Sequence, residues 1–191
     1  MHAHTLKEYT PAVSELLRLL ADLSYRESDV PFKLSSGRTS THFIDLKPTA
    51  MHTRGAKLIA DLMIEKLKPM DCDLIGGMET GGIPLVASIC ARCPDQMLKG
   101  AFFVRKQAKG HGTNKLIDGV FYKGAHTVLI EDVTTTGGSI LKAAEAIRAA
   151  GGHVSYVLTV VDREEGATEE LNAHNLTLIP LLTLSDLKNL G

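Results

Sequence analysis

The chain has 191 residues, which is enough for one α/β domain with a good core and too few for two ordinary domains. Its 21 basic and 22 acidic residues give a net charge of −1, so no global field would attract nucleic acid or an acidic membrane. The start of the chain lacks the apolar stretch of a signal peptide, and no run approaches the roughly 18 apolar residues of a membrane span.

The chain contains three cysteines, of which Cys90 and Cys93 have the spacing of a redox or metal pair. No second pair and no histidine cluster accompany them, so plain core or surface thiols are the more frequent explanation of this spacing. Together with the charge and the apolar pattern, this predicts a reduced, cytoplasmic protein.

The first part of the chain predicts a helix and a small antiparallel unit. Pro11–Leu23 carries its apolar residues at helical spacing, and residues 30–45 are typical of two short strands around Ser36 and Gly37. The antiparallel unit is not needed for the main sheet. We therefore expect a hood over the site, formed mainly by residues 1–50 with room for a C-terminal contribution, in a single domain of residues 1–191.

The rest of the chain alternates between strands and helices. The expected strands are 74–75, 101–104, 126–130, 156–161 and 176–179. The expected helices are Thr53–Leu67, 85–90 and one that begins at Ser139 and ends at Gly151. This order predicts an α/β fold with a mostly parallel central sheet flanked by helices. The ligand of such a sheet lies beyond the carboxyl ends of its strands, where four segments should converge: 76–82, 105–118, 131–139 and 162–166.

Residues 131–139 have the composition of a phosphate site between a strand and a helix. Glu131 and Asp132 follow the apolar strand, and the small residues 134–138 lead into the helix at Ser139. Backbone N–H groups and hydroxyls there can point at one anion, and the helix dipole adds to them. Two acids beside an anion site are explained if they accept hydrogen bonds from sugar hydroxyls, or if they lie near a cationic centre or a metal. The stretch resembles the phosphoribosyl-diphosphate motif of type I phosphoribosyltransferases, and an ordinary capped turn is the alternative interpretation.

Two further segments indicate anion binding. Residues 76–82 form a second glycine-rich turn, which could cradle a diphosphate or be a plain flexible turn. Residues 105–115 contain four cationic side chains and a histidine but no acid, and Gly110 and Gly112 deny the segment a stable helix or strand. A solvated basic loop is the usual explanation of such a run. Its position after a strand end favours a mobile lid that neutralises a polyanion and shields it from water.

The basic segment resembles the catalytic loop of orotate phosphoribosyltransferases in the pattern Arg105-Lys106-x-x-Lys109-x-His111-Gly112. The same family has a Val-Asp-Arg turn like residues 161–163 and a Phe-x-Leu-x-Ser-Gly-Arg-x-Ser segment like residues 32–40. The phosphoribosyl-diphosphate motif is shared by many type I phosphoribosyltransferases, so it indicates only this class of enzyme. The basic loop and the Val-Asp-Arg turn narrow the resemblance to the members of this class that use orotate as their substrate.

The resemblance implies transfer of the 5-phosphoribosyl group from 5-phosphoribosyl 1-diphosphate to orotate, giving orotidine 5′-phosphate and diphosphate, in pyrimidine biosynthesis. The implied catalytic residues are Arg105, Lys109, His111 and Asp132. The implied phosphoribosyl-diphosphate ligands are Arg105, Lys106, Lys109, His111, Glu131, Asp132, Val133, Thr134, Thr135, Thr136, Gly137, Gly138 and Ser139. The implied orotate neighbours are Thr135, Arg163, Phe43 and Ile44.

Other properties follow from the same resemblance. Mg²⁺ would be carried mainly by the oxygens of the substrate rather than by protein ligands. The family works as a homodimer in which the lid reaches into the site of the neighbouring subunit. For Arg163, an exposed salt bridge with Glu164 or Glu165 is the alternative to an orotate contact.

Two positions depart from the family pattern. Many members have a lysine where this chain has Ser35 and another where it has Gly81, and both would touch the diphosphate. Lys33 lies two residues before Ser35 on the same strand face and could partly substitute.

Two other functions remain open at this point. A purine or uracil phosphoribosyltransferase would share residues 131–139 but would have less use for Arg163 and for the basic lid. A non-catalytic regulator that senses phosphoribosyl diphosphate could shed the lid cations, all of which this chain keeps.

Overall fold

The computed structural model describes residues 9–33, 37, 39–106 and 116–190. Its helices are α1 (Pro11–Leu23), α2 (Lys47–Ala50), α3 (Thr53–Leu67), α4 (Gly82–Arg92), α5 (Gly138–Ala149), α6 (Ala167–Ala173) and α7 (Leu184–Lys188). Its strands are β1 (Tyr25–Lys33), β2 (Thr39–Ile44), β3 (Leu74–Met78), β4 (Gly100–Val104), β5 (Ile117–Gly119), β6 (His126–Thr134), β7 (His153–Asp162) and β8 (Thr177–Thr183).

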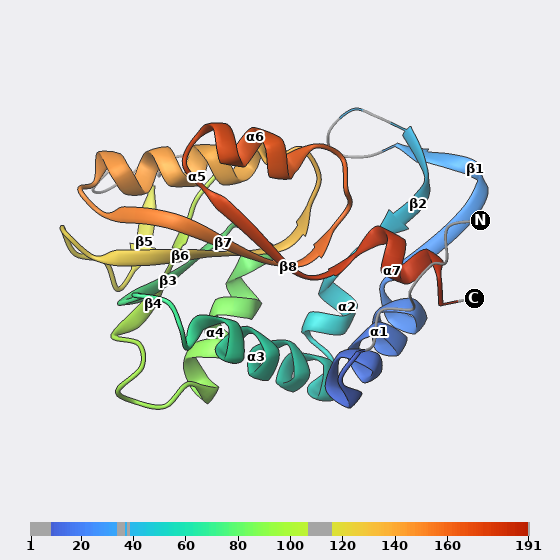
Figure 1. Cartoon of the computed structure of the whole chain (residues 1–191), viewed down its shortest axis with the longest axis horizontal. Helices are drawn as coiled ribbons and strands as arrows, with labels where there is room; N and C mark the ends of the chain where they lie inside the picture. The colour runs from blue at the N-terminus through green and yellow to red at the C-terminus, as the bar shows by residue number, and fades with distance from the viewer. Residues whose placement is uncertain (1–8, 34–36, 38, 107–115, 191) are drawn as a thin grey trace, which may run out of the picture.

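Six strands form the central sheet in the order β5-β4-β3-β6-β7-β8. Only the edge strand β5 runs antiparallel to its neighbour, and the other neighbours are parallel. Figure 1 shows α5 and α6 on one face of this sheet and α3 and α4 on the other. The predicted α/β fold with a mostly parallel sheet is confirmed. In the part of the chain that the structure describes, no helix combines the length and apolar character needed to cross a membrane.

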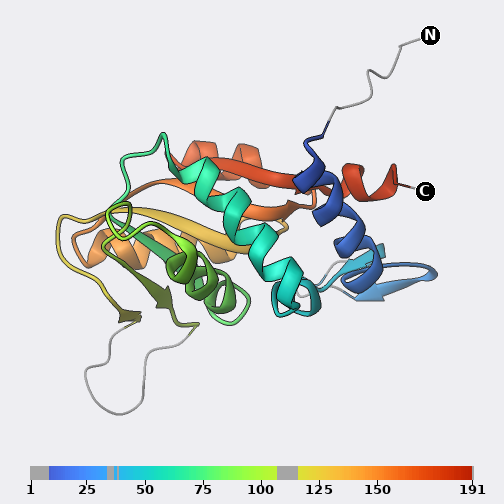
Figure 2. The ribbon, with the colours of Figure 1, turned by 90° about the horizontal axis from the view of Figure 1, so that it is seen from below.

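The hydrophobic core has two layers, one on each face of the sheet. Successive strand residues point to opposite faces, so buried Leu74 packs in the layer under α5 and α6, while Ile75 packs in the layer with α3 and α4. Helices α3 and α4 lie side by side across their face (Figure 2). Burial on both faces explains why the central strands contain nearly continuous apolar runs instead of an alternating pattern.

The hood is the antiparallel pair of β1 and β2, which lies beyond the carboxyl ends of the parallel strands (Figure 1). β1 begins at Tyr25, five residues before the predicted start. Helix α7 contacts α1, so the C-terminus lies beside the N-terminal part of the chain. The division into a hood and a single 1–191 domain stays a prediction.

The predicted turn at residues 76–82 is wrong in its first half. Gly76, Gly77 and Met78 belong to β3 and are buried. A Cβ built on Gly76 would lie 2.4 Å from the ring of Phe102, and one on Gly77 would lie 2.7 Å from the carbonyl oxygen of Gly82. These glycines therefore allow β3 to pack closely against Phe102 of β4 and against the start of α4, and the turn itself is confined to residues 79–81.

Two more boundaries differ from the prediction. Glu131 and Asp132 lie inside β6, because β7 continues to pair with that strand as far as Thr134. Residues 105–118 are not a loop throughout, since β5 returns along β4 and forms a hairpin with it. β5 has three residues and α2, α6 and α7 have four to seven, so none is long enough to show a period in the sequence.

Candidate active site

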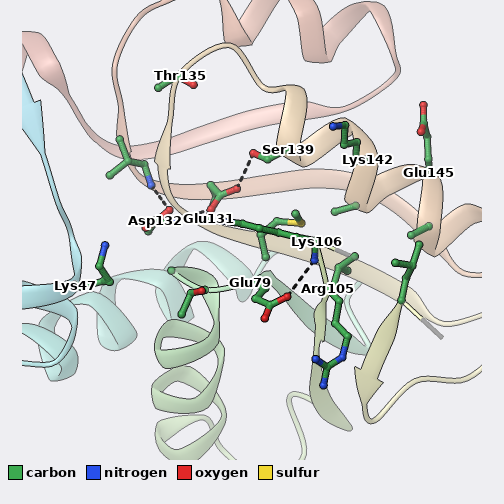
Figure 3. Close-up of a pocket in the computed structure, with 18 of the residues that line it drawn as sticks. Lys47, Glu79, Arg105, Lys106, Glu131, Asp132, Thr135, Ser139, Lys142 and Glu145 are labelled. Atoms are coloured by element: carbon green, nitrogen blue, oxygen red, sulfur yellow. Dashed lines mark hydrogen bonds between the residues drawn. The ribbon is translucent and has the colours of Figure 1, made fainter. Parts of the chain in front are cut away.

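A cavity of about 1080 Å³ lies beyond the carboxyl ends of β3, β4 and β6, with α5 along one side (Figure 3). It is lined by Lys47, Met78, Glu79, Thr80, Gly81, Val104, Arg105, Lys106, Leu116, Glu131, Asp132, Val133, Thr135, Ser139, Lys142, Ala143, Glu145, Ala146 and Ala149. Parts of three of the four predicted segments, 76–82, 105–118 and 131–139, therefore meet, as expected for a parallel sheet, whereas no residue of 162–166 lines this cavity.

Seven of the predicted phosphoribosyl-diphosphate ligands line this cavity: Arg105, Lys106, Glu131, Asp132, Val133, Thr135 and Ser139. Thr134, Thr136, Gly137 and Gly138 lie in the same strand end and turn but are not among the lining residues. Lys109 and His111 lie outside the described residues. Of the predicted orotate neighbours, Thr135 lines the cavity, whereas Phe43, Ile44 and Arg163 do not.

Glu131 and Asp132 form an acid pair with unequal surroundings. The side chain of Glu131 is buried; its Oε1 accepts a hydrogen bond from the Asp132 N–H at 3.2 Å and its Oε2 accepts one from Ser139 Oγ at 3.4 Å. Burial, together with the neighbouring charge of Asp132, raises the pKa of Glu131 well above its ordinary range. Asp132 is less buried, and its Oδ1 accepts a hydrogen bond from the Val133 N–H at 2.8 Å. Glu131 is thus the member of the pair whose charged form is disfavoured by burial.

Gly81 lies directly against Asp132. A Cβ built on Gly81 would come within 1.9 Å of Asp132 Oδ2, so a side chain at position 81 cannot coexist with this placement of the carboxylate. The turn of residues 79–81 therefore approaches the acid pair without contributing a cation of its own.

The amino-terminal end of α5 is open to an anion. Its N-cap is Gly137, at φ +83°, and no side chain caps the helix. The first N–H groups of a helix have no partner within the helix, and the dipole makes this end electropositive. Nearby, Thr134 Oγ1 is buried without a hydrogen-bond partner among the described residues. These groups have the chemistry of a phosphate site.

The lid segment begins with two residues that are held in place. Arg105 forms an ion pair with Asp118 across the β4–β5 hairpin, with a nitrogen–oxygen distance of 2.5 Å. The backbone N–H of Lys106 donates to Glu79 Oε2 at 3.1 Å, which joins the start of the lid to the turn after β3. The two cations therefore enter the cavity from a fixed base.

The predicted ligands did not include four charged residues that line the cavity: Lys47, Glu79, Lys142 and Glu145. Lys142 could have been found, because it lies three residues after Ser139 and so shares a helix face with it. Glu79 could have been found as the acid within the glycine-rich turn. No local pattern in the sequence indicates that Lys47 lines the cavity, because its position depends on how the segment after the hood packs against the sheet.

Arg163 is buried at the end of β7, and its side chain is only 3% exposed. Its Nε donates to Glu165 Oε1 at 2.6 Å, and both terminal nitrogens donate to the His42 carbonyl at 3.2 Å. The predicted salt-bridge partner Glu165 is present, but Arg163 is buried and Glu165 is half-buried instead of exposed. Arg163 thus links the hood to the sheet, and its contact with orotate stays a prediction.

No family profile matches the chain. It is 45% identical over 161 residues to the orotate phosphoribosyltransferase of Rhodopseudomonas palustris strain BisB18, covering 80% of this chain and 84% of that protein. Among solved structures, Mycobacterium tuberculosis orotate phosphoribosyltransferase in complex with Fe(III) dicitrate gives a TM-score of 0.80 at 37% identity, over 93% of this chain and 99% of that one. The same protein in complex with 5-phospho-α-D-ribosyl 1-diphosphate gives 0.77 at 36% identity, with the same coverage. The chain belongs to the orotate phosphoribosyltransferase family.

Proposed function

We propose that this protein transfers the 5-phosphoribosyl group of phosphoribosyl diphosphate to orotate, giving orotidine 5′-phosphate and diphosphate, in pyrimidine (UMP) biosynthesis. One observation carries the proposal: the acid pair of buried Glu131 and half-buried Asp132 lines one cavity with Ser139, in the first turn of the uncapped helix α5, and with the cationic base of the lid. The acids can accept hydrogen bonds from the ribose hydroxyls, and the amino-terminal end of the helix can bind the 5′-phosphate. The cations can neutralise the diphosphate.

The residues divide the chemistry between them. As diphosphate leaves C1, the sugar acquires oxocarbenium character, which the negative charge of Asp132 stabilises. Residues 134–139 hold the 5′-phosphate, and Glu131 holds a ribose hydroxyl. Arg105, Lys106, Lys109 and His111 neutralise the departing diphosphate, and His111 or a lysine can supply a proton to it.

Mg²⁺ is the proposed metal. The carboxylates of Glu79 and Asp132 place hard oxygen donors at the cavity, which fits an ion that keeps several waters and binds through few carboxylates plus substrate phosphates. No three His, Cys, Asp or Glu side chains within the described ranges are grouped to hold a metal ion. When bound with the substrate, the ion would neutralise charge on the diphosphate.

Orotate would lie on the hood side, near Thr135, Phe43, Ile44 and Arg163. Arg163→Ala should raise the KM for orotate far more than the KM for phosphoribosyl diphosphate, because the two terminal nitrogens can hold the carboxylate of the base once they exchange the His42 carbonyl for it. Equal effects on both constants would argue against this clamp.

A homodimer with lids shared between subunits is part of the proposal, as is a cytoplasmic location. Mixing inactive Lys109→Ala with inactive Asp132→Asn under conditions that exchange subunits tests the sharing. If lids act in trans, each mixed dimer has one intact site, and random pairing restores about a quarter of wild-type activity. No recovery would show that lids act in cis, and a monomer at assay concentration would end the shared-site proposal.

A panel of bases tests the substrate. With Mg²⁺ and phosphoribosyl diphosphate, orotate should be consumed much faster than uracil, adenine or hypoxanthine. Turnover of another base alone would assign the protein to a purine or uracil transferase. Tight binding of phosphoribosyl diphosphate with no turnover of any base would assign it to the regulators.

A further inference from the structure

The turn of residues 79–81 is poor in positive charge for a diphosphate site. Its side chains at the cavity are Glu79 and Thr80, and the carboxylate of Asp132 blocks any side chain at position 81. A diphosphate near this turn would face carboxylates unless a cation reaches it from another element.

Of the described residues that line the cavity, four are cations: Lys47, Arg105, Lys106 and Lys142. Figure 3 shows Lys47 on one side of Asp132 and the other three on the opposite side. Arg105 is already paired with Asp118. Lys47 is therefore the cation that approaches the turn from the hood side.

The backbone of Lys47 is held in place by buried neighbours, whereas its side chain is exposed. Its neighbours Leu46, Thr49 and Ala50 are buried, and Thr49 Oγ1 lies 2.6 Å from Ser24 Oγ. The side chain of Lys47 is 54% exposed, and its Nζ lies 2.5 Å from Asp45 Oδ1. Asp45 is thus the counter-ion of the Lys47 ammonium.

Exchange of that counter-ion is energetically easy. An exposed lysine–carboxylate pair contributes little, about 0–1 kcal/mol, because water screens both charges. A diphosphate offers several charged oxygens at once, so it competes well for the ammonium. Lys33, the substitute proposed from the sequence, is exposed on β1 and does not line the cavity.

We propose that Lys47 binds the diphosphate group of the substrate and of the product from the hood side, exchanging Asp45 for a phosphate oxygen. This rests on the proposed function, because a diphosphate must enter the cavity. The lid cations would hold the departing diphosphate on one side and Lys47 would hold it on the other. Its charge would then be neutralised even though the turn of residues 79–81 supplies no cation.

The test compares Lys47→Ala with a matched control, Lys68→Ala. Lys68 is 56% exposed and forms an equally short ion pair, 2.5 Å, with Glu65, but it does not line the cavity. Lys47→Ala should raise both the KM for phosphoribosyl diphosphate and the Kd of inorganic diphosphate about ten-fold, the loss of one hydrogen bond to a charged group. The KM for orotate should change less than two-fold, Lys68→Ala should match wild type, and Lys47→Arg should restore most of the binding.

A Lys47→Ala protein that behaves like Lys68→Ala would overturn the proposal, and so would a larger change in the KM for orotate. Asp45→Asn distinguishes a binding role of Lys47 from a structural role of the Lys47–Asp45 pair. It should bind diphosphate at least as tightly as wild type. If Asp45→Asn weakens diphosphate binding as much as Lys47→Ala does, the ion pair acts structurally and the proposal is wrong. If Lys47→Ala does not fold, Lys47→Gln replaces it. Calorimetric binding of inorganic diphosphate needs no turnover, so it tests Lys47 even if the wild type proves inactive on orotate.

Discussion

Gly81 lies so close to Asp132 that a Cβ on Gly81 would come within 1.9 Å of Asp132 Oδ2, so the absence of a side chain at position 81 leaves room for the Asp132 carboxylate. The backbone of Gly81 has φ −66° and ψ −34°, which any residue adopts, so this glycine is required for space and not for conformation. Gly81→Ala should therefore displace Asp132 without unfolding the chain. We expect kcat/KM to fall at least about ten-fold, while the thermal unfolding midpoint changes little.

Asp132→Asn keeps the shape of the side chain and removes its charge. We expect kcat to fall at least about ten-fold, or about 1.4 kcal/mol of transition-state stabilisation. In the double variant with Gly81→Ala, the loss should be no larger than in Asp132→Asn alone, because both changes act on one carboxylate. A near-normal kcat in Asp132→Asn would mean that this residue has a structural role only. If the losses of the two single variants multiply in the double variant, Gly81 and Asp132 act independently.

Glu131 should make stability depend on pH. Its folded-state pKa is raised by burial and by Asp132, so the folded chain holds a proton that the unfolded chain releases more easily. The stability of the wild type should therefore fall as the pH rises above about 4.3, the ordinary value for glutamate, until the pH passes the folded-state pKa. Glu131→Gln mimics the protonated form and should lack this loss.

Urea unfolding of both proteins at a series of pH values measures the effect. The difference in the free energy of unfolding should grow with pH in favour of Glu131→Gln. A constant difference would mean that Glu131 ionises in the folded chain as it does in water.

The sequence allowed the parallel sheet, the long helices and the meeting of three strand-end segments at one cavity to be predicted, because apolar periodicity and glycine-rich turns are local signals. It did not show that Gly76 makes room for Phe102 or that the acid pair lies inside β6, since both depend on neighbouring strands. Lys47 was missed for a similar reason. Its place depends on the packing of α2 beneath the hood, which no spacing in the chain reveals.

Arg163→Ala should also destabilise the fold. The buried guanidinium compensates the charge of Glu165, whose Oε2 already lacks a hydrogen-bond partner among the described residues. Leaving one member of a fully buried pair alone costs about 3–5 kcal/mol, and we expect a smaller loss here because Glu165 is only half-buried. The double variant Arg163→Ala/Glu165→Ala should recover part of this loss in urea unfolding. If the single variant is as stable as wild type, the pair is not structural, and the orotate role stands alone.

The central claim is that this chain joins orotate to the phosphoribosyl group. The most direct measurement follows the loss of orotate absorbance together with diphosphate release, in the presence of Mg²⁺ and phosphoribosyl diphosphate. We predict that one diphosphate appears for each orotate consumed, and that Asp132→Asn slows both at least about ten-fold. Diphosphate release without loss of orotate, or no reaction of orotate at all, would contradict the account.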